Sequence, residues 1–205
     1  MVKVKICGIT NTEDALASVD AGCDALGFVF YKKSPRYILP AQAKKIINAL
    51  PKGVVKIGVF VNSKEEEIRR TAKLCDLNMI QLHGKESPGF CNRLKDFKVI
   101  KAFRINDNVN LGKIPRYNTY AYLFDTFVKS KIGGTGRIFD WRLVRNLKNI
   151  KQPIFLSGGL TEKNVLKAIA YLKPAWVDVS SSVEIEPGKK GQYKVRKFIK
   201  AAKGG

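Results

Sequence analysis

Short apolar runs alternate with amphipathic stretches along the whole chain. Most of the runs are close to continuously apolar, as is typical of strands that are covered on both faces of a parallel sheet. Their length is that of ordinary strands, roughly four to eight residues. We expect strands over residues 4–7, 24–30, 54–61, 78–82, 99–103, 120–124, 153–156 and 175–179.

The stretches between these runs carry helix-start signals. Asn11 or Thr12 is suited to cap the first helix, and Pro40 stands where the first turn of the second would begin. Ser63 and Glu66 have the spacing of a capping box that opens the third. With their caps, the expected helices cover residues 11–21, 40–50, 63–74, 88–94, 141–147, 162–171 and 193–202.

Eight successive strands joined by helical crossovers predict a parallel sheet, because parallel strands need such crossovers. A closed (β/α)₈ TIM barrel has a usual lower limit of roughly 200 residues. We therefore expect a single α/β domain over residues 1–205, in which the fifth helix is short or missing, since 104–119 shows little helical periodicity. An open doubly wound sheet is the alternative. The segment after the first strand lacks the G-x-G-x-x-G motif of its dinucleotide-binding form.

The net charge of +21 raises the possibility of a polyanion partner, because Lys and Arg neutralise phosphates. The basic residues are spread over most of the expected helices, however, without aromatic stacking residues or a nucleic-acid motif. A solvated, Lys-rich surface is therefore favoured over a nucleic-acid-binding face. A weaker positive field that attracts a small anion fits either interpretation.

Other bulk features indicate a soluble, cytoplasmic protein. No apolar run approaches the roughly 18 residues of a membrane span, and the alternating pattern of residues 2–6 differs from that of a signal peptide. The four cysteines form no C-x-x-C pair, and His83 is the only histidine, so neither a zinc site nor another metal site is expected. Disulfides are also disfavoured, and each cysteine is either a small core residue or a reactive thiol.

Polar residues end or follow most of the expected strands. In a TIM barrel the active site lies at the carboxyl ends of the strands, so these side chains should meet at one mouth. They are Cys7, Arg36, Gln81, His83, Asp125, Asp178, Ser180 and Ser181.

Three of these residues also have structural interpretations. Asp125 ends an apolar strand, where burial raises the pKa of a carboxyl group and suits it to general acid catalysis, but aspartate also caps loops. Asp178 is either a site residue or a core carboxylate held by hydrogen bonds. A lone histidine such as His83 is more often structural than catalytic.

Glycines follow the two strands that precede the last one. Gly158 and Gly159 come after the seventh strand, and Gly134 and Gly136 lie in the loop after the sixth. The loops after strands seven and eight of TIM barrels commonly bind phosphate. Together with the serines at 180–182, Gly158 and Gly159 predict a phosphate site, whereas Gly134 and Gly136 fit an ordinary turn equally well.

These motifs together resemble the phosphoribosylanthranilate isomerase family of tryptophan biosynthesis over essentially the whole chain. The segments that carry the resemblance are KICGIT at 5–10, GFVF at 27–30, SPRYI at 34–38, GVFVN at 58–62, QLHG at 81–84, the strand end at Asp125, GGTGRIFDW at 133–141, LSGGL at 156–160, and DVSS with the following VE at 178–184.

The resemblance implies an Amadori rearrangement of N-(5-phosphoribosyl)anthranilate to 1-(2-carboxyphenylamino)-1-deoxyribulose 5-phosphate, without cofactor or metal. It implies that Asp125 is the general acid and Cys7 the general base, and that Arg36 contacts the anthranilate carboxylate. Asp178 would engage sugar hydroxyls or orient the site, and Gln81 and His83 would line its mouth. The implied phosphate region contains Gly134, Gly136, Gly158, Gly159, Ser180, Ser181 and Ser182.

One departure from the family pattern concerns Ser182, which stands where the family usually has glycine. If that position needs a positive φ, serine strains the loop and weakens phosphate affinity. Two alternatives to the isomerase stay open: another sugar-phosphate barrel enzyme, such as indole-glycerol-phosphate synthase, and a non-catalytic polyanion-binding protein. The expected partner is a small phosphosugar, without nucleic acid or membrane, and a homodimer is one candidate for the oligomeric state.

Overall fold

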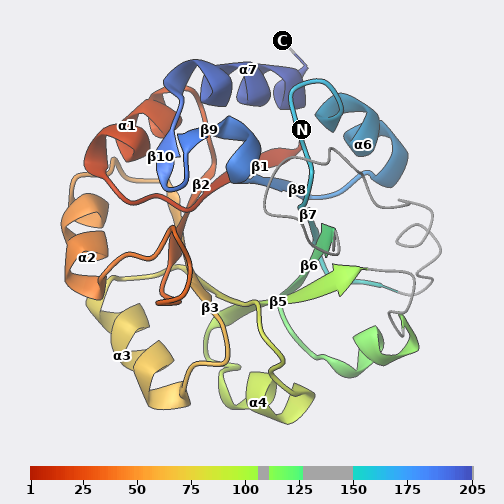
Figure 1. Cartoon of the computed structure of the whole chain (residues 1–205). Coiled ribbons are helices and arrows are strands. Elements are labelled where there is room, and N and C mark those ends of the chain that lie inside the picture. The colour runs from red at the N-terminus through yellow and green to blue at the C-terminus, as the bar shows by residue number, and fades with distance from the viewer. Residues whose placement is uncertain (106–110, 127–149, 205) are drawn as a thin grey trace.

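Eight parallel strands close into a barrel in the computed structural model of the chain, which describes residues 1–105, 111–126 and 150–204 (Figure 1). Every strand pairs with its neighbours in sequence, and β8 returns to pair with β1. This confirms the predicted TIM barrel. The strands are β1 (Lys3–Cys7), β2 (Ala25–Val29), β3 (Val55–Phe60), β4 (Met79–Leu82), β5 (Lys98–Ile105), β6 (Ala121–Thr126), β7 (Ile154–Leu156) and β8 (Trp176–Val179).

Helices form a ring around the barrel (Figure 1). The described part of the connection between β5 and β6 holds a 3₁₀ helix, η1 (Leu111–Arg116), in place of a full fifth helix, as the weak periodicity predicts. The helix expected at 141–147 lies outside the described residues. The α-helices are α1 (Thr12–Asp20), α2 (Pro40–Asn48), α3 (Glu65–Leu74), α4 (Pro88–Arg93), α6 (Val165–Leu172) and α7 (Gln192–Lys203). None of the helices in the described ranges is both long and apolar enough to span a membrane.

The helix starts agree with the predicted caps except at α3. The Asn11 side chain accepts a hydrogen bond from the Asp14 amide at 2.8 Å, and Pro40 occupies the first turn of α2. The predicted capping box of Ser63 and Glu66 is wrong, because α3 starts one residue later, with Lys64 as a cap residue that makes no side-chain hydrogen bond. The start of α3 is stabilised instead by acidic side chains in its first turn, which interact favourably with the positive end of the helix dipole.

Alternation along the strands separates two layers of core. One face of each strand packs on the helices, and the other points into the barrel. The inward layer contains Ile57, Leu123 and the stacked rings of Phe155 and Trp176, whose centroids lie 4.9 Å apart. Asp125 follows Leu123 by two positions and therefore also points into the barrel, nearer the carboxyl end of β6. This apolar packing therefore supports the polar mouth described below.

A short hairpin that the apolar pattern does not indicate follows β8. The chain passes through a 3₁₀ turn, η2 (Ser181–Val183), and then forms β9 (Glu184–Glu186) and β10 (Lys189–Lys190). These strands are short and mostly charged, so they lack an apolar run. The Lys190 amide donates to Asp14 of α1 at 2.7 Å, which attaches the hairpin to the side of the barrel.

Candidate active site

A pocket of about 350 Å³ opens at the carboxyl ends of the strands. The barrel brings most of the polar residues expected from the sequence to this one place. Arg104 and Tyr31, which the sequence pattern does not single out, also line it. Gly134 and Gly136 lie outside the described residues. The expected residues in the pocket lining are Cys7, Arg36, Gln81, His83, Asp125, Gly158, Gly159, Asp178, Ser180, Ser181 and Ser182.

Cys7 ends β1 with its side chain on the inner side of the barrel and is 8% exposed. Burial raises the pKa of its thiol, and the positive charge of Lys5 partly offsets that rise. The neighbouring strand makes room for the sulfur at Gly27, because a Cβ atom on this glycine would lie only 2.7 Å from Sγ. The sequence pattern does not single out Gly27, although glycine inside a strand often marks such a close approach.

A continuous series of hydrogen bonds joins Asp178 to Asp125 across the barrel. Lys5 Nζ donates to Asp178 Oδ1 and to Gln81 Oε1, both at 2.9 Å. The Gln81 Nε2 atom lies 2.9 Å from His83 Nδ1, and His83 Nε2 lies 3.2 Å from Asp125 Oδ2. Asp125 itself lies within β6, so its carboxylate projects from a strand and not from a flexible loop.

Asp178 is a nearly buried carboxylate at the inner end of the pocket. Its carboxylate is 4% exposed and forms an ion pair with Lys5, which is fully buried. It is therefore a buried carboxylate paired with Lys5, and it also lines the pocket. The buried position of Lys5 is the feature that sequence reasoning missed.

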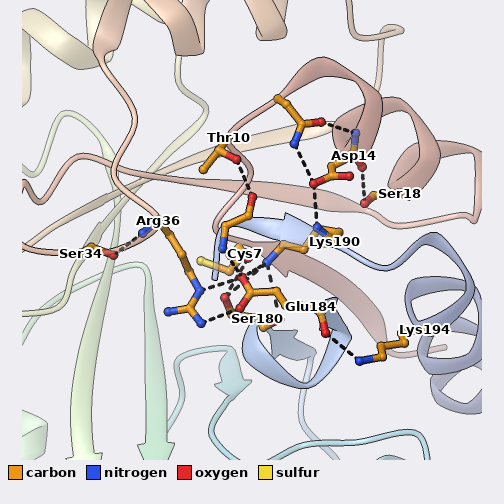
Figure 2. Close-up of polar contacts among 12 residues, drawn as sticks. Cys7, Thr10, Asp14, Ser18, Ser34, Arg36, Ser180, Glu184, Lys190 and Lys194 are labelled. Atoms are coloured by element: carbon orange, nitrogen blue, oxygen red, sulfur yellow. Dashed lines mark hydrogen bonds and ion pairs between the residues drawn. The ribbon is translucent and has the colours of Figure 1, made fainter. Parts of the chain in front are cut away.

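Arg36 is held from one side by a buried carboxylate. Its Nε and Nη2 atoms donate to the two oxygens of Glu184 at 2.8 and 2.6 Å, and Lys190 Nζ donates to the same carboxylate at 2.8 Å. Figure 2 shows both cations converging on Glu184. The hydrogen bonds to Glu184 raise the pKa of Arg36. Within the described part of the chain, Nη1 of Arg36 has no hydrogen-bond partner, so it is available to a ligand in the pocket.

Glu184 and Lys190 form a buried ion pair in which each charge shifts the pKa of the other. Burial alone would raise the pKa of Glu184, but Arg36 and Lys190 together lower it, so the carboxylate is ionised. Burial lowers the pKa of Lys190 despite the opposing effect of Glu184. Neither residue was predicted for the site; the VE pair at 183–184 in the family pattern was the sequence signal for Glu184, and no quoted motif contains Lys190.

The predicted phosphate region consists of two adjacent backbone segments. Gly158 and Gly159 follow β7 with φ of 83° and 64°, which glycine adopts without strain. Backbone strain was expected at Ser182 if this position needed a positive φ. Ser182 lies in the η2 turn and is not among the described residues with positive φ, so this strain is absent there. Its hydroxyl donates to the Leu160 carbonyl at 2.5 Å and thus joins the two segments, while Ser180 Oγ donates to the Cys7 carbonyl at 3.0 Å.

Comparison with known proteins gives consistent relatives. Residues 4–201 match the model of a family described as N-(5'-phosphoribosyl)anthranilate (PRA) isomerase. The enzyme of that name from Trichlorobacter lovleyi is 48% identical over 203 residues, which cover 99% of this chain and 98% of the relative.

Two solved structures extend the similarity to three dimensions. A phosphoribosyl anthranilate isomerase in complex with reduced 1-(o-carboxyphenylamino)-1-deoxyribulose 5-phosphate superposes with a TM-score of 0.90 at 44% identity. Monomers generated from the dimeric Thermotoga maritima enzyme superpose with a TM-score of 0.89 at 42% identity. Both comparisons cover the full length of both chains.

Proposed function

This chain belongs to the phosphoribosylanthranilate isomerase family, and from that premise we propose that Cys7 and Asp125 perform the proton transfers of its reaction. The protein is an isomerase of tryptophan biosynthesis that converts an aldose into a ketose. The observation that supports the two assignments is that a thiol on β1 and a carboxylate on β6 line the same pocket.

The acid acts first in the proposed reaction. Asp125 gives a proton to the furanose ring oxygen of N-(5-phosphoribosyl)anthranilate, and the bond from C1 to that oxygen breaks. The anilino nitrogen supplies the electron pair that forms the C1=N iminium. Asp125 is left as a carboxylate, hydrogen-bonded to His83 at 3.2 Å. An acid held on a rigid strand is suited to this step, because protonation requires a fixed distance to the ring oxygen.

The base acts second. The Cys7 thiolate takes the proton from C2, and the electrons of that C–H bond move toward the iminium nitrogen to form an enolamine. The enolamine then tautomerises to the ketone of 1-(2-carboxyphenylamino)-1-deoxyribulose 5-phosphate. Burial raises the pKa of the thiol, so the free site holds mainly thiol, and the positive iminium beside it favours the thiolate when it is needed. Each transfer is assigned to a residue of the chain, so the scheme calls for no cofactor or metal.

Arg36 and the two loop segments are proposed to bind the ends of the substrate. The Nη1 atom of Arg36, which has no hydrogen-bond partner in the part of the chain that the structure describes, suits the anthranilate carboxylate, since a guanidinium binds a planar anion directionally. The backbone around Gly158, Gly159 and Ser180–Ser182 is proposed to bind the phosphate. In support of this proposal, the solved structure of a relative contains reduced 1-(o-carboxyphenylamino)-1-deoxyribulose 5-phosphate, a ligand that carries both a carboxyl group and a phosphate.

Replacing Glu184 by glutamine is expected to raise KM about tenfold with a smaller change in kcat. Glutamine cannot accept both hydrogen bonds of the Arg36 fork and carries no charge, so the guanidinium loses the partner that orients it. Steady-state kinetics would measure the effect. Glu186→Gln is the matched control, because this exposed residue of β9 has, within the described ranges, only a weak pair with Lys189 at 3.9 Å. Equal KM values in the two variants would contradict the role of Glu184.

The wild-type chain is expected to consume phosphoribosylanthranilate, which is followed as the loss of its fluorescence. The same preparation should bind duplex DNA weakly, and this binding should disappear as salt is added, because it would reflect the charge of +21 alone. Salt-sensitive DNA binding without any turnover would instead support the polyanion-binding alternative.

Two further properties are part of the proposal. We place the enzyme in the cytoplasm, which agrees with four cysteines that are all free thiols. We also propose that two copies associate, because the Thermotoga maritima relative is described as dimeric. The proposed binding partner of the active site is the small phosphosugar substrate.

A further inference from the structure

Lys5 is a fully buried ammonium group directly beneath the proposed catalytic thiol. It lies two residues before Cys7 on β1, and both side chains point into the barrel. A Cβ atom on Gly27 of the neighbouring strand would lie 2.7 Å from the Cys7 sulfur and 3.0 Å from Lys5 Cε. The two side chains therefore meet over the same glycine. No step of the proposed reaction uses this buried charge.

The donors and acceptors around Lys5 determine the tautomer of His83. An ammonium group only donates, so the atom of Gln81 at 2.9 Å from Lys5 Nζ must be its carbonyl oxygen. The amide nitrogen of Gln81 then faces His83 Nδ1 at 2.9 Å, and that ring nitrogen must accept. The proton of the neutral imidazole is consequently on Nε2, from which it points to the Asp125 carboxylate.

The same ammonium group acts on the thiol through its charge. The charged groups that influence Cys7 come from four elements: Lys5 on β1, Asp178 on β8, Lys190 on β10 and Arg36 in the loop after β2. Lys5 exerts the largest effect that lowers the pKa of Cys7 against the rise caused by burial, whereas Asp178 raises it. Asp178 and Cys7 in turn raise the pKa of Lys5 although burial opposes this, so the ammonium form persists.

We propose that Lys5 is a positioning residue for both halves of the acid–base pair: its charge favours the Cys7 thiolate, and its hydrogen bond to Gln81 sets the His83 tautomer that orients Asp125. This inference rests on the proposed roles of Cys7 and Asp125. Asp178 is the counterion that keeps the ammonium group in place. One buried side chain thereby connects residues that lie on separate strands of the barrel.

The first test measures the reactivity of Cys7 without using turnover. The rate of iodoacetamide modification of the Cys7 peptide is followed by mass spectrometry across pH. Lys5→Met is expected to shift the profile upward by about one pH unit or more, and Asp178→Asn to shift it downward. Lys3→Met, at an exposed position of the same strand, is the matched control and should leave the profile unchanged.

Opposite shifts in the two variants are a result that general loosening of the core would not produce. Turnover at neutral pH should fall roughly 3- to 10-fold in Lys5→Met, since a smaller thiolate fraction is partly offset by a stronger base. If Lys5→Met does not fold, the same profile is measured in Lys5→Gln, which also removes the charge and for which an upward shift is again expected. An unchanged profile, or shifts of the same sign in both variants, would overturn the electrostatic role of Lys5.

The second test determines by NMR which ring nitrogen of His83 carries the proton. His83 is the only histidine, so protein labelled with [¹⁵N]histidine gives the nitrogen signals of a single ring. We expect a protonated Nε2 and an unprotonated Nδ1 in the wild type, and a mixture of tautomers in Lys5→Met, where the Gln81 amide is free to rotate. A wild-type ring protonated on Nδ1, or identical spectra in the two proteins, would overturn the positioning role.

The outcome separates this inference from the function on which it rests. If Cys7→Ser is inactive but Lys5→Met leaves both the alkylation profile and the imidazole signals unchanged, Cys7 remains the base and Lys5 is only structural. If Cys7→Ser turns over normally, the catalytic assignment itself fails, whatever the alkylation profile shows.

Discussion

Cys7→Ser is expected to lower kcat by about 10²- to 10⁴-fold, the range that a positioned general base contributes. A serine hydroxyl is a much weaker acid than a thiol, so it supplies almost no anion to remove the C2 proton. The substitution changes little else, because serine is close to cysteine in size and shape and the space above Gly27 is kept. The fluorescence assay measures the loss, and thermal unfolding followed by circular dichroism checks that the variant is folded.

Cys91→Ser is the matched control for this variant. Cys91 is also a buried thiol, but it lies on α4 and does not line the active-site pocket. The same chemical change there should reduce stability, because it places a hydroxyl among apolar groups, and leave kcat near the wild-type value. A Cys7→Ser enzyme that retained wild-type turnover would show that another group removes the proton.

Asp125→Asn is expected to reduce kcat by a similar factor, about 10²- to 10⁴-fold. Asparagine has nearly the same shape as aspartate, and its carbonyl oxygen still accepts the hydrogen bond from His83, so the geometry of the series from Lys5 to residue 125 is preserved. Only the acidic proton is lost. Without it, the ring oxygen must leave as an alkoxide, which is far less favourable than leaving as an alcohol.

Asp96→Asn provides the corresponding control. This aspartate is exposed and pairs with Arg69 at 2.7 Å, a surface contact of little energetic value. Removing its charge should affect neither kcat nor KM. The assignment of Asp125 would be wrong if Asp125→Asn and Asp96→Asn had similar turnover, and loss of the folded state in Asp125→Asn is excluded by thermal unfolding.

The order of elements was predictable because it depends on local properties. Each strand of the barrel is a short apolar run, and Asn11 and Pro40 mark helix starts through interactions within a few residues. The same local reasoning failed at α3, where three successive glutamates stabilise the helix start without the predicted capping box. It also missed the charged hairpin of β9 and β10, although Pro187 and Gly188 between them are a recognisable turn signal.

The candidate site was predictable in its outline for a different reason. Once eight parallel strands close into a barrel, residues at their carboxyl ends converge whatever their separation in sequence. Cys7 and Asp125 could therefore be placed at one mouth from their positions, while the family resemblance singled them out as an acid–base pair. The burial of Lys5 could not be predicted, because a lysine in an apolar strand is expected to be exposed unless its partners are known. Its inward direction was implied by its spacing of two from Cys7, which is the signal that could have revealed it.

The amino-acid sequence by itself determined the succession of strands and helices, the barrel, and the thiol and carboxylate available at its mouth. The tertiary structure alone decided which charges are buried and which groups they face. Lys5 meets Asp178 and Arg36 meets Glu184 across long stretches of chain, because closure of the barrel places β8 and the following hairpin beside β1. A buried charge is stable only with a partner, and partners so far apart in sequence leave no local pattern.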